Sequence, residues 1–433
     1  MTERTNLDRD LSMYFELRST SRAPAGLLEA TLRDVDRTRQ RPTWTLTVRR
    51  VAERLHDRWT LPNSARLLLA VIAVLAVLLV AAFVIGGSQR RLPPPFGPAR
   101  PGLLAFDTSS HIGLLNADGT GLTMLTSGPE VDRYPIWSPD GTRIAFVASR
   151  DLSLGLVVMD ADGRHRITLA DQVHRAGGLH ASVSFGSFVP MTWSPDSQRI
   201  AFAGDFGDGP HLYVSPADRP APERIGPADL DATAPSWSPD GTLIAFRHAE
   251  DADHPQAVWL IRPDGGGLHK LSHSPMVIDV FPGAAWAPDG KRLAFLAEGM
   301  SHSNDVYVIN ADGTDQRDVT FTPDDEQWAS WSPDGKRLTV GWFEGASGVF
   351  VTDVGGTNRV DLPTGGNRIS TPAWSPDGAR IVGYRDAGLM DGIPEGINGV
   401  SDGFLVLDPT GRDRPMFIPE NSLGSVTWQR LAP

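Results

Sequence analysis

The sequence contains no cysteine, so it has neither a disulfide framework nor a thiolate nucleophile. It also lacks a His-Glu-x-x-His zinc motif and a glycine-rich phosphate-binding motif. These absences argue against two enzyme classes: zinc peptidases and P-loop nucleotidases. Stability must therefore come from packing and from the way in which the chain closes on itself.

Basic residues are scarce in most of the chain. Residues 1–66 hold 13 arginines and nine acidic residues, whereas residues 102–433 hold 24 basic and 43 acidic residues. The net charge is therefore +4 in the first segment and −19 in the last. Because contacts to phosphate need clustered Lys and Arg, we expect no nucleic-acid partner. An acidic surface instead favours cations or basic protein partners.

A five-residue motif recurs along the acidic part of the chain, at tryptophan spacings of 43 to 56 residues. Its copies are Trp137-Ser138-Pro139-Asp140-Gly141, Trp193-Ser194-Pro195-Asp196-Ser197, Trp237-Ser238-Pro239-Asp240-Gly241, Trp286-Ala287-Pro288-Asp289-Gly290, Trp331-Ser332-Pro333-Asp334-Gly335 and Trp374-Ser375-Pro376-Asp377-Gly378, with a truncated copy at Trp428. Proline and glycine at these positions predict a tight turn between two strands. A period in the forties with a fixed turn is typical of four-stranded propeller blades.

The number of blades follows from a second set of turns, which end the third strand of each unit. Seven such turns begin at Asn116, Asp160, Pro216, Pro263, Asn310, Asp353 and Pro409. The first unit lacks a tryptophan strand, and the strand at Trp428 has no unit after it. We therefore predict an all-β, seven-bladed propeller over 102–433. One C-terminal strand closes it by joining three N-terminal strands, which removes an open sheet edge.

These repeats resemble the TolB-like, WD-repeat-like family of β-propellers, and the resemblance covers about three quarters of the chain. The resemblance implies a propeller fold. The layout of the whole chain also resembles that of membrane-anchored bacterial forms, whose N-terminal segments are likened to anti-sigma regulators. The family's namesake usually has six blades and an additional α/β domain in front. This sequence indicates neither feature.

The remaining quarter of the chain predicts a membrane anchor. We expect a helical cytoplasmic segment at 1–65, a transmembrane helix at 66–87 and a proline-rich linker at 88–101. Residues 67–85 carry no polar side chain and are long enough to span a bilayer. Five arginines closely precede this stretch and three follow it. This bias predicts a single-pass protein in the cytoplasmic membrane of a bacterium, with its N-terminus inside and the propeller outside.

Strand parity predicts where the propeller binds. The short turns share one face. Because the propeller begins with a second strand, we expect the chain to enter the ring from this face and the face to look toward the membrane. The longer and more variable connections lie on the opposite face, which suits a protein or peptide partner. Carboxylates near the starts of the inner strands are our candidate ligand residues, and they could hold Ca²⁺ or a basic peptide at the channel mouth. They are Asp132, Asp231, Asp279, Asp325, Glu326 and Glu420. Alternatively, each caps its own turn through an Asx hydrogen bond.

The hypothesis that combines these features is a membrane-anchored, extracytoplasmic binding scaffold without catalytic residues. Two alternatives stay open. One is a channel-centred lyase or hydrolase that acts on glycans. The other is a transmembrane sensor whose regulatory segment is 1–65. The fold alone does not decide between them, because propellers host many functions.

Overall fold

The structure is a computed structural model. It describes residues 97–108, 110–150, 153–173, 191–206, 209–249, 256–273, 284–299, 303–344, 346–365, 368–386, 403–419 and 422–431. The expected helical segment 1–65 and transmembrane helix 66–87 lie outside these residues. In the described part of the chain, no helix has the length and apolarity needed to cross a bilayer.

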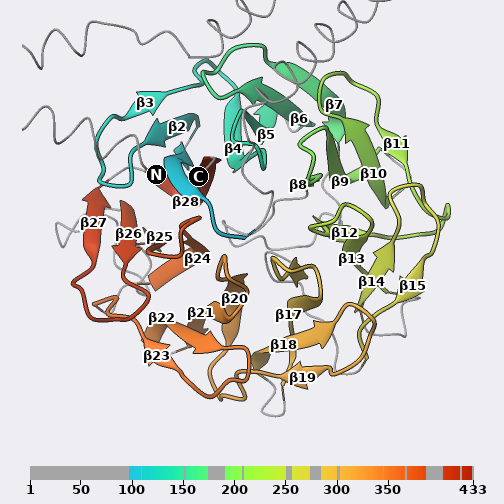
Figure 1. Ribbon diagram of the computed structural model, residues 1–433. Helices are drawn as coiled ribbons and strands as arrows, with labels where there is room; N and C mark the ends of the chain where they lie inside the picture. The colour runs from blue at the N-terminus through green and yellow to red at the C-terminus, as the bar shows by residue number, and fades with distance from the viewer. Residues whose placement is uncertain are drawn as a thin grey trace, which may run out of the picture. The chain divides into compact units, whose positions relative to one another are not determined.

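The described residues form seven four-stranded antiparallel sheets arranged as blades around a central axis (Figure 1). Blades 1 to 3, from inner to outer strand, are β4 (Val131–Trp137), β5 (Arg143–Arg150), β6 (Ser153–Asp160) and β7 (Ile167–Val173); β8 (Met191–Trp193), β9 (Arg199–Asp205), β10 (Pro210–Pro216) and β11 (Glu223–Arg224); and β12 (Thr233–Trp237), β13 (Ile244–His248), β14 (Ala257–Ile261) and β15 (His269–Lys270).

Blades 4 to 6 continue the same order. Their strands are β16 (Ala285–Trp286), β17 (Arg292–Glu298), β18 (Asn304–Asn310) and β19 (Arg317–Asp318); β20 (Glu326–Trp331), β21 (Arg337–Glu344), β22 (Ala346–Asp353) and β23 (Val360–Asp361); and β24 (Arg368–Trp374), β25 (Ile381–Asp386), β26 (Gly403–Leu407) and β27 (Met416–Pro419). The closing blade consists of β28 (Ser422–Leu431), β1 (Arg100–Thr108), β2 (Ile112–Leu115) and β3 (Thr123–Met124).

The closing blade confirms the predicted joining of the two chain ends. Strand β28 is its inner strand and pairs antiparallel with β1, so that Leu104 lies opposite Trp428. The side chain of Gln429 accepts a hydrogen bond from the Leu103 amide at 3.1 Å and donates one to the Gly141 carbonyl of blade 1 at 2.8 Å. The last strand is therefore bonded within its own sheet and to the next blade.

The repeated turn is held by its own serine and aspartate. In blade 1 the Gly141 amide donates to the Ser138 carbonyl at 2.8 Å, and the Arg143 amide donates to Ser138 Oγ at 2.9 Å. The Asp140 carboxylate accepts from the Thr142 amide at 3.0 Å. The same pattern recurs in blade 3, where Asp240 replaces Asp140. The motif therefore encodes a self-contained turn.

The glycine of this turn has a positive φ, of 70° at Gly141 and 75° at Gly241. A Cβ at Gly141 would lie 2.3 Å from the Arg430 carbonyl oxygen, whereas a Cβ at Gly241 meets nothing closer than 3.7 Å. We expect Gly241→Ala to cost about 1 kcal/mol from backbone strain alone. Gly141→Ala should cost at least about 2 kcal/mol more, because the closing strand must shift. Urea unfolding of both variants measures the difference, and equal losses would contradict the role of Gly141 at the seam.

Tryptophan and arginine side chains join each blade to the next. All seven motif tryptophans are buried. Several indole Nε1 groups donate to the inner strand of the preceding blade, as Trp193 does to the Ile136 carbonyl at 3.2 Å. The arginine after the turn lies over the tryptophan ring of the following blade. These pairs are Arg143 with Trp193, Arg199 with Trp237, Arg292 with Trp331 and Arg337 with Trp374, at 4.8–5.2 Å. Such contacts each contribute about 0.5–2 kcal/mol.

Three inner strands carry a β-bulge at the same place. Tyr134, Ala234 and Thr371 each precede a proline and have positive φ values of 58°, 50° and 49°. The pairing with the second strand shifts register across each of them. A bulge changes which face of the sheet the following side chains occupy. The alternation of side chains at the start of the inner strand therefore does not continue as far as its tryptophan.

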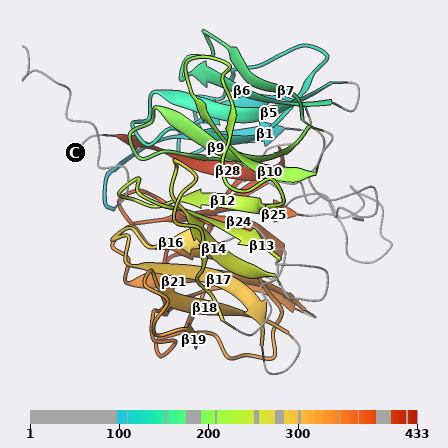
Figure 2. The same cartoon turned by 90° about the vertical axis from the view of Figure 1, so that its right-hand side faces the viewer.

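The tight turns share one face of the ring, which we call the tight-turn face, and the other face is the variable face. Residues just before β1 lie on the tight-turn face, since the Ala99 amide donates to the Pro376 carbonyl at 2.8 Å. In Figure 2 the C-terminal end of β28 lies on the same face, at the left of the view. The prediction that the chain enters the ring from the tight-turn face is therefore confirmed.

Candidate functional site

The predicted ligand carboxylates fall into described and undescribed positions. Asp132, Asp231, Asp325 and Glu326 are described, whereas Asp279 and Glu420 lie outside the described residues. The four described residues stand at or just before the start of inner strands β4, β12 and β20, on the variable face. Their side chains nevertheless meet very different surroundings.

Asp132 forms an ion pair inside blade 1. Its side chain is 1% exposed and accepts a hydrogen bond from Arg166 Nη2 at 3.0 Å. The same guanidinium also binds Glu130 at 2.8 Å and lies over the Phe146 ring. The carboxylate of Asp132 is therefore already neutralised and enclosed.

Asp325 and Glu326 link blade 5 to blade 4. Asp325 accepts a hydrogen bond from the Asn304 amide of β18 at 3.1 Å and one from Gln327 Nε2 at 2.6 Å. Glu326 is fully buried, and its Oε1 accepts from Thr322 Oγ1 at 2.7 Å. Burial, together with the nearby carboxyl of Asp305, raises the pKa of Glu326 to about 9. The two side chains act as blade-joining groups, which is close to the turn-capping alternative.

Asp231 lies near His248, His211 and Arg247, and the repeat pattern of the sequence did not predict this grouping. His248 Nδ1 lies 2.8 Å from the Asp231 carbonyl oxygen, and His211 Nδ1 lies 3.0 Å from that of Leu230. Loss of hydration raises the pKa of the Asp231 carboxyl, while His248 and Arg247 oppose the rise. Across the described residues, no group of three or more His, Asp or Glu side chains has the arrangement of a metal site.

Asp107 is a blade-joining carboxylate that the sequence analysis missed. It is 1% exposed, and it accepts hydrogen bonds from the amides of Ser425 at 2.8 Å and Tyr134 at 3.1 Å. These amides belong to β28 and β4, so one side chain ties the closing blade to blade 1. Burial raises the pKa of its carboxyl, against the lowering effect of the two amides. Its place on a second strand gave no signal in the repeat pattern.

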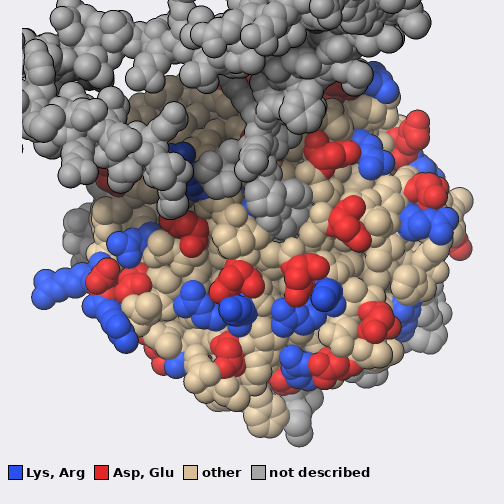
Figure 3. All heavy atoms as spheres, viewed as in Figure 1, with Lys and Arg blue, Asp and Glu red and all other residues tan. Residues whose placement is uncertain are grey.

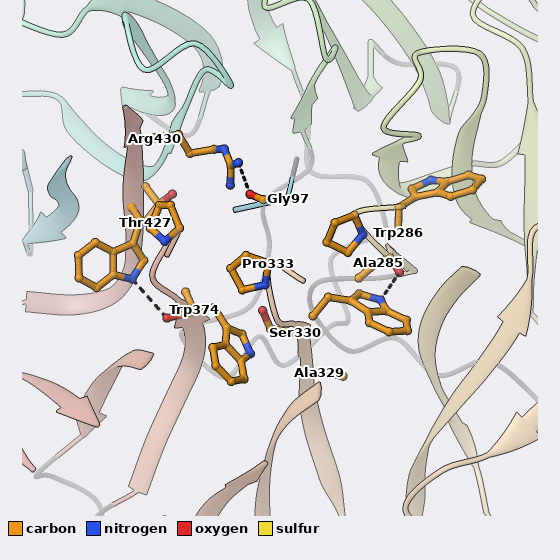
Figure 4. Close-up of a pocket in the computed structure, with 14 residues that line it drawn as sticks. Gly97, Ala285, Trp286, Ala329, Ser330, Pro333, Trp374, Thr427 and Arg430 are labelled. Carbon is orange, nitrogen blue, oxygen red and sulfur yellow. Dashed lines mark hydrogen bonds between the residues drawn. The ribbon is translucent and has the colours of Figure 1, made fainter. Parts of the chain in front are cut away.

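A cavity of about 300 Å³ lies near the axis toward the tight-turn face (Figure 4). Its wall includes Trp286, Trp331, Trp374 and Trp428 from four successive blades. Three of these indoles donate to main-chain carbonyls: Trp286 Nε1 to Ser236 at 3.0 Å, Trp331 Nε1 to Ala285 at 3.0 Å and Trp428 Nε1 to Ala373 at 3.3 Å. Arg430 also donates to the Gly97 carbonyl at the edge of the cavity. Among the described residues of this wall none is acidic, and most are apolar.

Charges on the tight-turn face are intermixed (Figure 3). Acidic and basic side chains alternate around the visible ring, and pairs such as Arg292 with Asp289 at 3.3 Å recur at the turns. The visible surface therefore has no single-sign patch of the kind that binds a nucleic acid or an anionic surface.

Comparison with known proteins gives relatives of several kinds. The chain is 25% identical over 212 residues to the uncharacterized peptidase YuxL of Bacillus subtilis, which covers 40% of this chain and 31% of that protein. It is 28% identical over 173 residues to the Tol-Pal system protein TolB of Anaeromyxobacter dehalogenans, which covers 39% and 36% of the two chains. The match therefore spans only about a third of the length of either relative.

Solved structures share the fold at low identity. The propeller domain of the Trilobed protease from Pyrococcus furiosus aligns with a TM-score of 0.53 and 13% identity, covering 75% of this chain and 96% of that one. An oligogalacturonate lyase in complex with manganese aligns with a TM-score of 0.52 and 16% identity, covering 73% and 91%. The model of the TolB beta propeller domain matches residues 156–393, which is more than half of the sequence. The chain belongs to the TolB beta propeller domain family.

Proposed function

We propose that this protein is a membrane-anchored, extracytoplasmic scaffold that binds a protein or peptide through the variable face of its propeller. The supporting observation is that the chain entry and the variable connections lie on opposite faces of a closed ring. The chain enters at the tight-turn face beside Pro376, whereas the connections that differ from blade to blade leave from the other face. A tether on one side leaves the variable face accessible to a partner.

The anchor in this proposal is the apolar stretch 67–85, with residues 1–65 in the cytoplasm. Because the chain has no cysteine, single-cysteine variants give an unambiguous test. Lys336→Cys, on an exposed tight turn, should react with a membrane-impermeant maleimide in intact cells. Ser19→Cys should react only after the membrane is permeabilised. Labelling of Ser19→Cys in intact cells would reject the orientation.

The binding face is tested by photo-crosslinking in the full-length protein. A photoreactive amino acid replaces either Phe321, which is 69% exposed on the variable face, or Lys336 on the tight-turn face of the neighbouring blade. We expect a discrete crosslinked adduct from position 321 and none from position 336. Adducts only from position 336 would contradict the proposal. Cleavage of cell-envelope oligosaccharides by the purified protein would favour the lyase or hydrolase alternative instead.

A further inference from the structure

Three acidic side chains converge where blade 4 meets blade 5 on the variable face. They are Asp305 at the start of β18, Asp318 at the end of β19 and Glu326 at the start of β20. Asp305 is 2% exposed and Glu326 is fully buried. Residues Thr320–Thr322, in the connection between β19 and β20, contact all three carboxyls.

All three carboxyls bind this same connection. Thr322 bridges two of them, because its Oγ1 donates to Glu326 Oε1 at 2.7 Å and its amide donates to Asp305 Oδ1 at 3.4 Å. The Thr320 and Phe321 amides both donate to Asp318 Oδ1, at 3.0 and 2.9 Å. Phe321 is held there with a φ of 42°, which a bulky residue rarely adopts. The connection depends on the carboxyls for its shape.

Among the described residues, no basic side chain compensates the charge of these three acids. In the part of the chain that the structure describes, none of the three carboxyls forms an ion pair with Lys or Arg. The nearby Arg359 pairs instead with Asp324 at 3.6 Å and Asp361 at 2.9 Å. The other titratable groups nearby are Asp325, which accepts from Asn304 and Gln327, and Tyr307 on β18.

Two carboxyl oxygens in this cluster are buried without a hydrogen-bond partner. They are Glu326 Oε2 and Asp318 Oδ2. A buried carboxylate oxygen without a donor loses its hydration and gains no hydrogen bond in return. Asp305 also packs tightly, since a Cβ at Gly299 would lie 1.7 Å from its Oδ2. Glycine at 299 therefore leaves room for the Asp305 carboxyl.

In blade 1 a buried acid at the matching position of the inner strand is paired with an arginine. Asp132 stands five residues before Trp137, as Glu326 stands five residues before Trp331. Asp132 is equally enclosed, but Arg166 donates to it at 3.0 Å. Blade 1 thus pairs this acid with an arginine, whereas in blade 5 Arg359 pairs with Asp324 and Glu326 lies near Asp305.

We propose that Asp305 and Glu326 share one proton at neutral pH, and that this proton fastens blade 4 to blade 5 on the variable face. The protonated Glu326 donates to the Asp305 carboxylate, and the pair holds Thr322 and the exposed Phe321 in place. Loss of the proton leaves two facing negative charges and releases the Thr320–Thr322 connection. The variable face therefore changes its order with pH.

Electrostatics supports the geometry. Burial and the neighbouring acid raise the pKa of Glu326 to about 9, and burial with the Asp318 charge raises the pKa of Asp305 to about 6. Both values are above those of the unfolded chain. The stabilisation by the shared proton is therefore complete in acid and is lost as the pH rises through about 9.

The test compares the wild-type protein with Glu326→Gln, which keeps the shape and remains uncharged. The wild type should lose thermal stability between about pH 6 and pH 10, and its Thr320–Thr322 amides should lose at least about tenfold in exchange protection, corrected for intrinsic rates. Glu326→Gln should remove most of both changes. Asp325→Asn, which alters the adjacent acid and leaves the pair intact, should retain the wild-type behaviour.

A second readout needs no variant. The wild-type protein at pH 7 should show the infrared carbonyl band of a protonated carboxyl, and this band should disappear in Glu326→Gln. Absence of the band from the wild type overturns the proposal. The same pH dependence in Glu326→Gln and wild type would also overturn it.

Discussion

A chain that ends at residue 420 should not form a closed propeller. Strand β28 supplies Val426 and Trp428 to the core between blade 6 and the closing blade, and it covers the whole length of β1. Loss of the buried tryptophan alone costs about 3–5 kcal/mol, which is comparable to the whole stability of many domains. The unpaired β1 would also expose a sheet edge. We expect loss of the cooperative unfolding transition and association into oligomers.

The measurement is circular dichroism with thermal unfolding, combined with size-exclusion chromatography of the truncated protein in detergent. Adding a synthetic peptide of residues 421–433 should restore a transition, because the missing strand pairs through its main chain with β1. A peptide in which Trp428 is alanine is the matched control and should restore less. A monomeric truncated protein with unchanged melting would show that closure contributes little.

Trp237→Ala should be the most damaging single core substitution among the seven motif tryptophans. Trp237 is 1% exposed, Arg199 lies over its ring at 5.0 Å, and it packs with Ile244, Phe246 and Ile261. We expect a loss of about 3–5 kcal/mol in the free energy of unfolding, because the blade cannot collapse into the cavity left behind.

The matched control is Trp259→Ala in the same blade. Trp259 is only half-buried at the edge of the same cluster, so its loss should cost about 1–2 kcal/mol. Denaturant titrations of both variants against the wild type give the two losses. Equal losses would mean that the motif tryptophan has no special place in the joint between blades 2 and 3.

The repeat pattern predicted most of the fold because its information is local. The turn around Ser138 depends on residues within five positions, and seven similar units leave few ways to arrange the strands. The parity of strands then fixed which face the chain enters. The joining of chain ends also followed, since an incomplete first unit and an isolated last strand complete one blade.

The candidate site was less predictable because its partners are distant in the sequence. Asp132 and Glu326 share an offset from tryptophan, yet one meets Arg166 and the other meets Asp305. The offset places a side chain on the inner strand and says nothing about the outer strands. Bulges such as that at Tyr134 also change the register between the strand start and its tryptophan. The wall formed by Gly97 and Arg430 joins residues 333 positions apart.

Cysteine labelling tests the anchor and the orientation that we propose for residues 1–65 and 66–87, which lie outside the described residues. The proposed partner likewise depends on the crosslinking comparison between the two faces. Neither depends on the proton shared by Asp305 and Glu326, which is tested on stability and spectroscopy alone.

Several contacts between neighbouring blades pair an arginine of one repeat with the tryptophan of the next. This arrangement has a consequence for how the number of repeats can change in evolution. A unit such as Trp193 to Arg199 receives an arginine from the blade before it and offers one to the blade after it. A duplicated gene segment that carries both halves can be inserted at a repeat boundary, and the new unit already fits its neighbours. Ring size can then change through whole-repeat duplication without new contacts arising by point mutation.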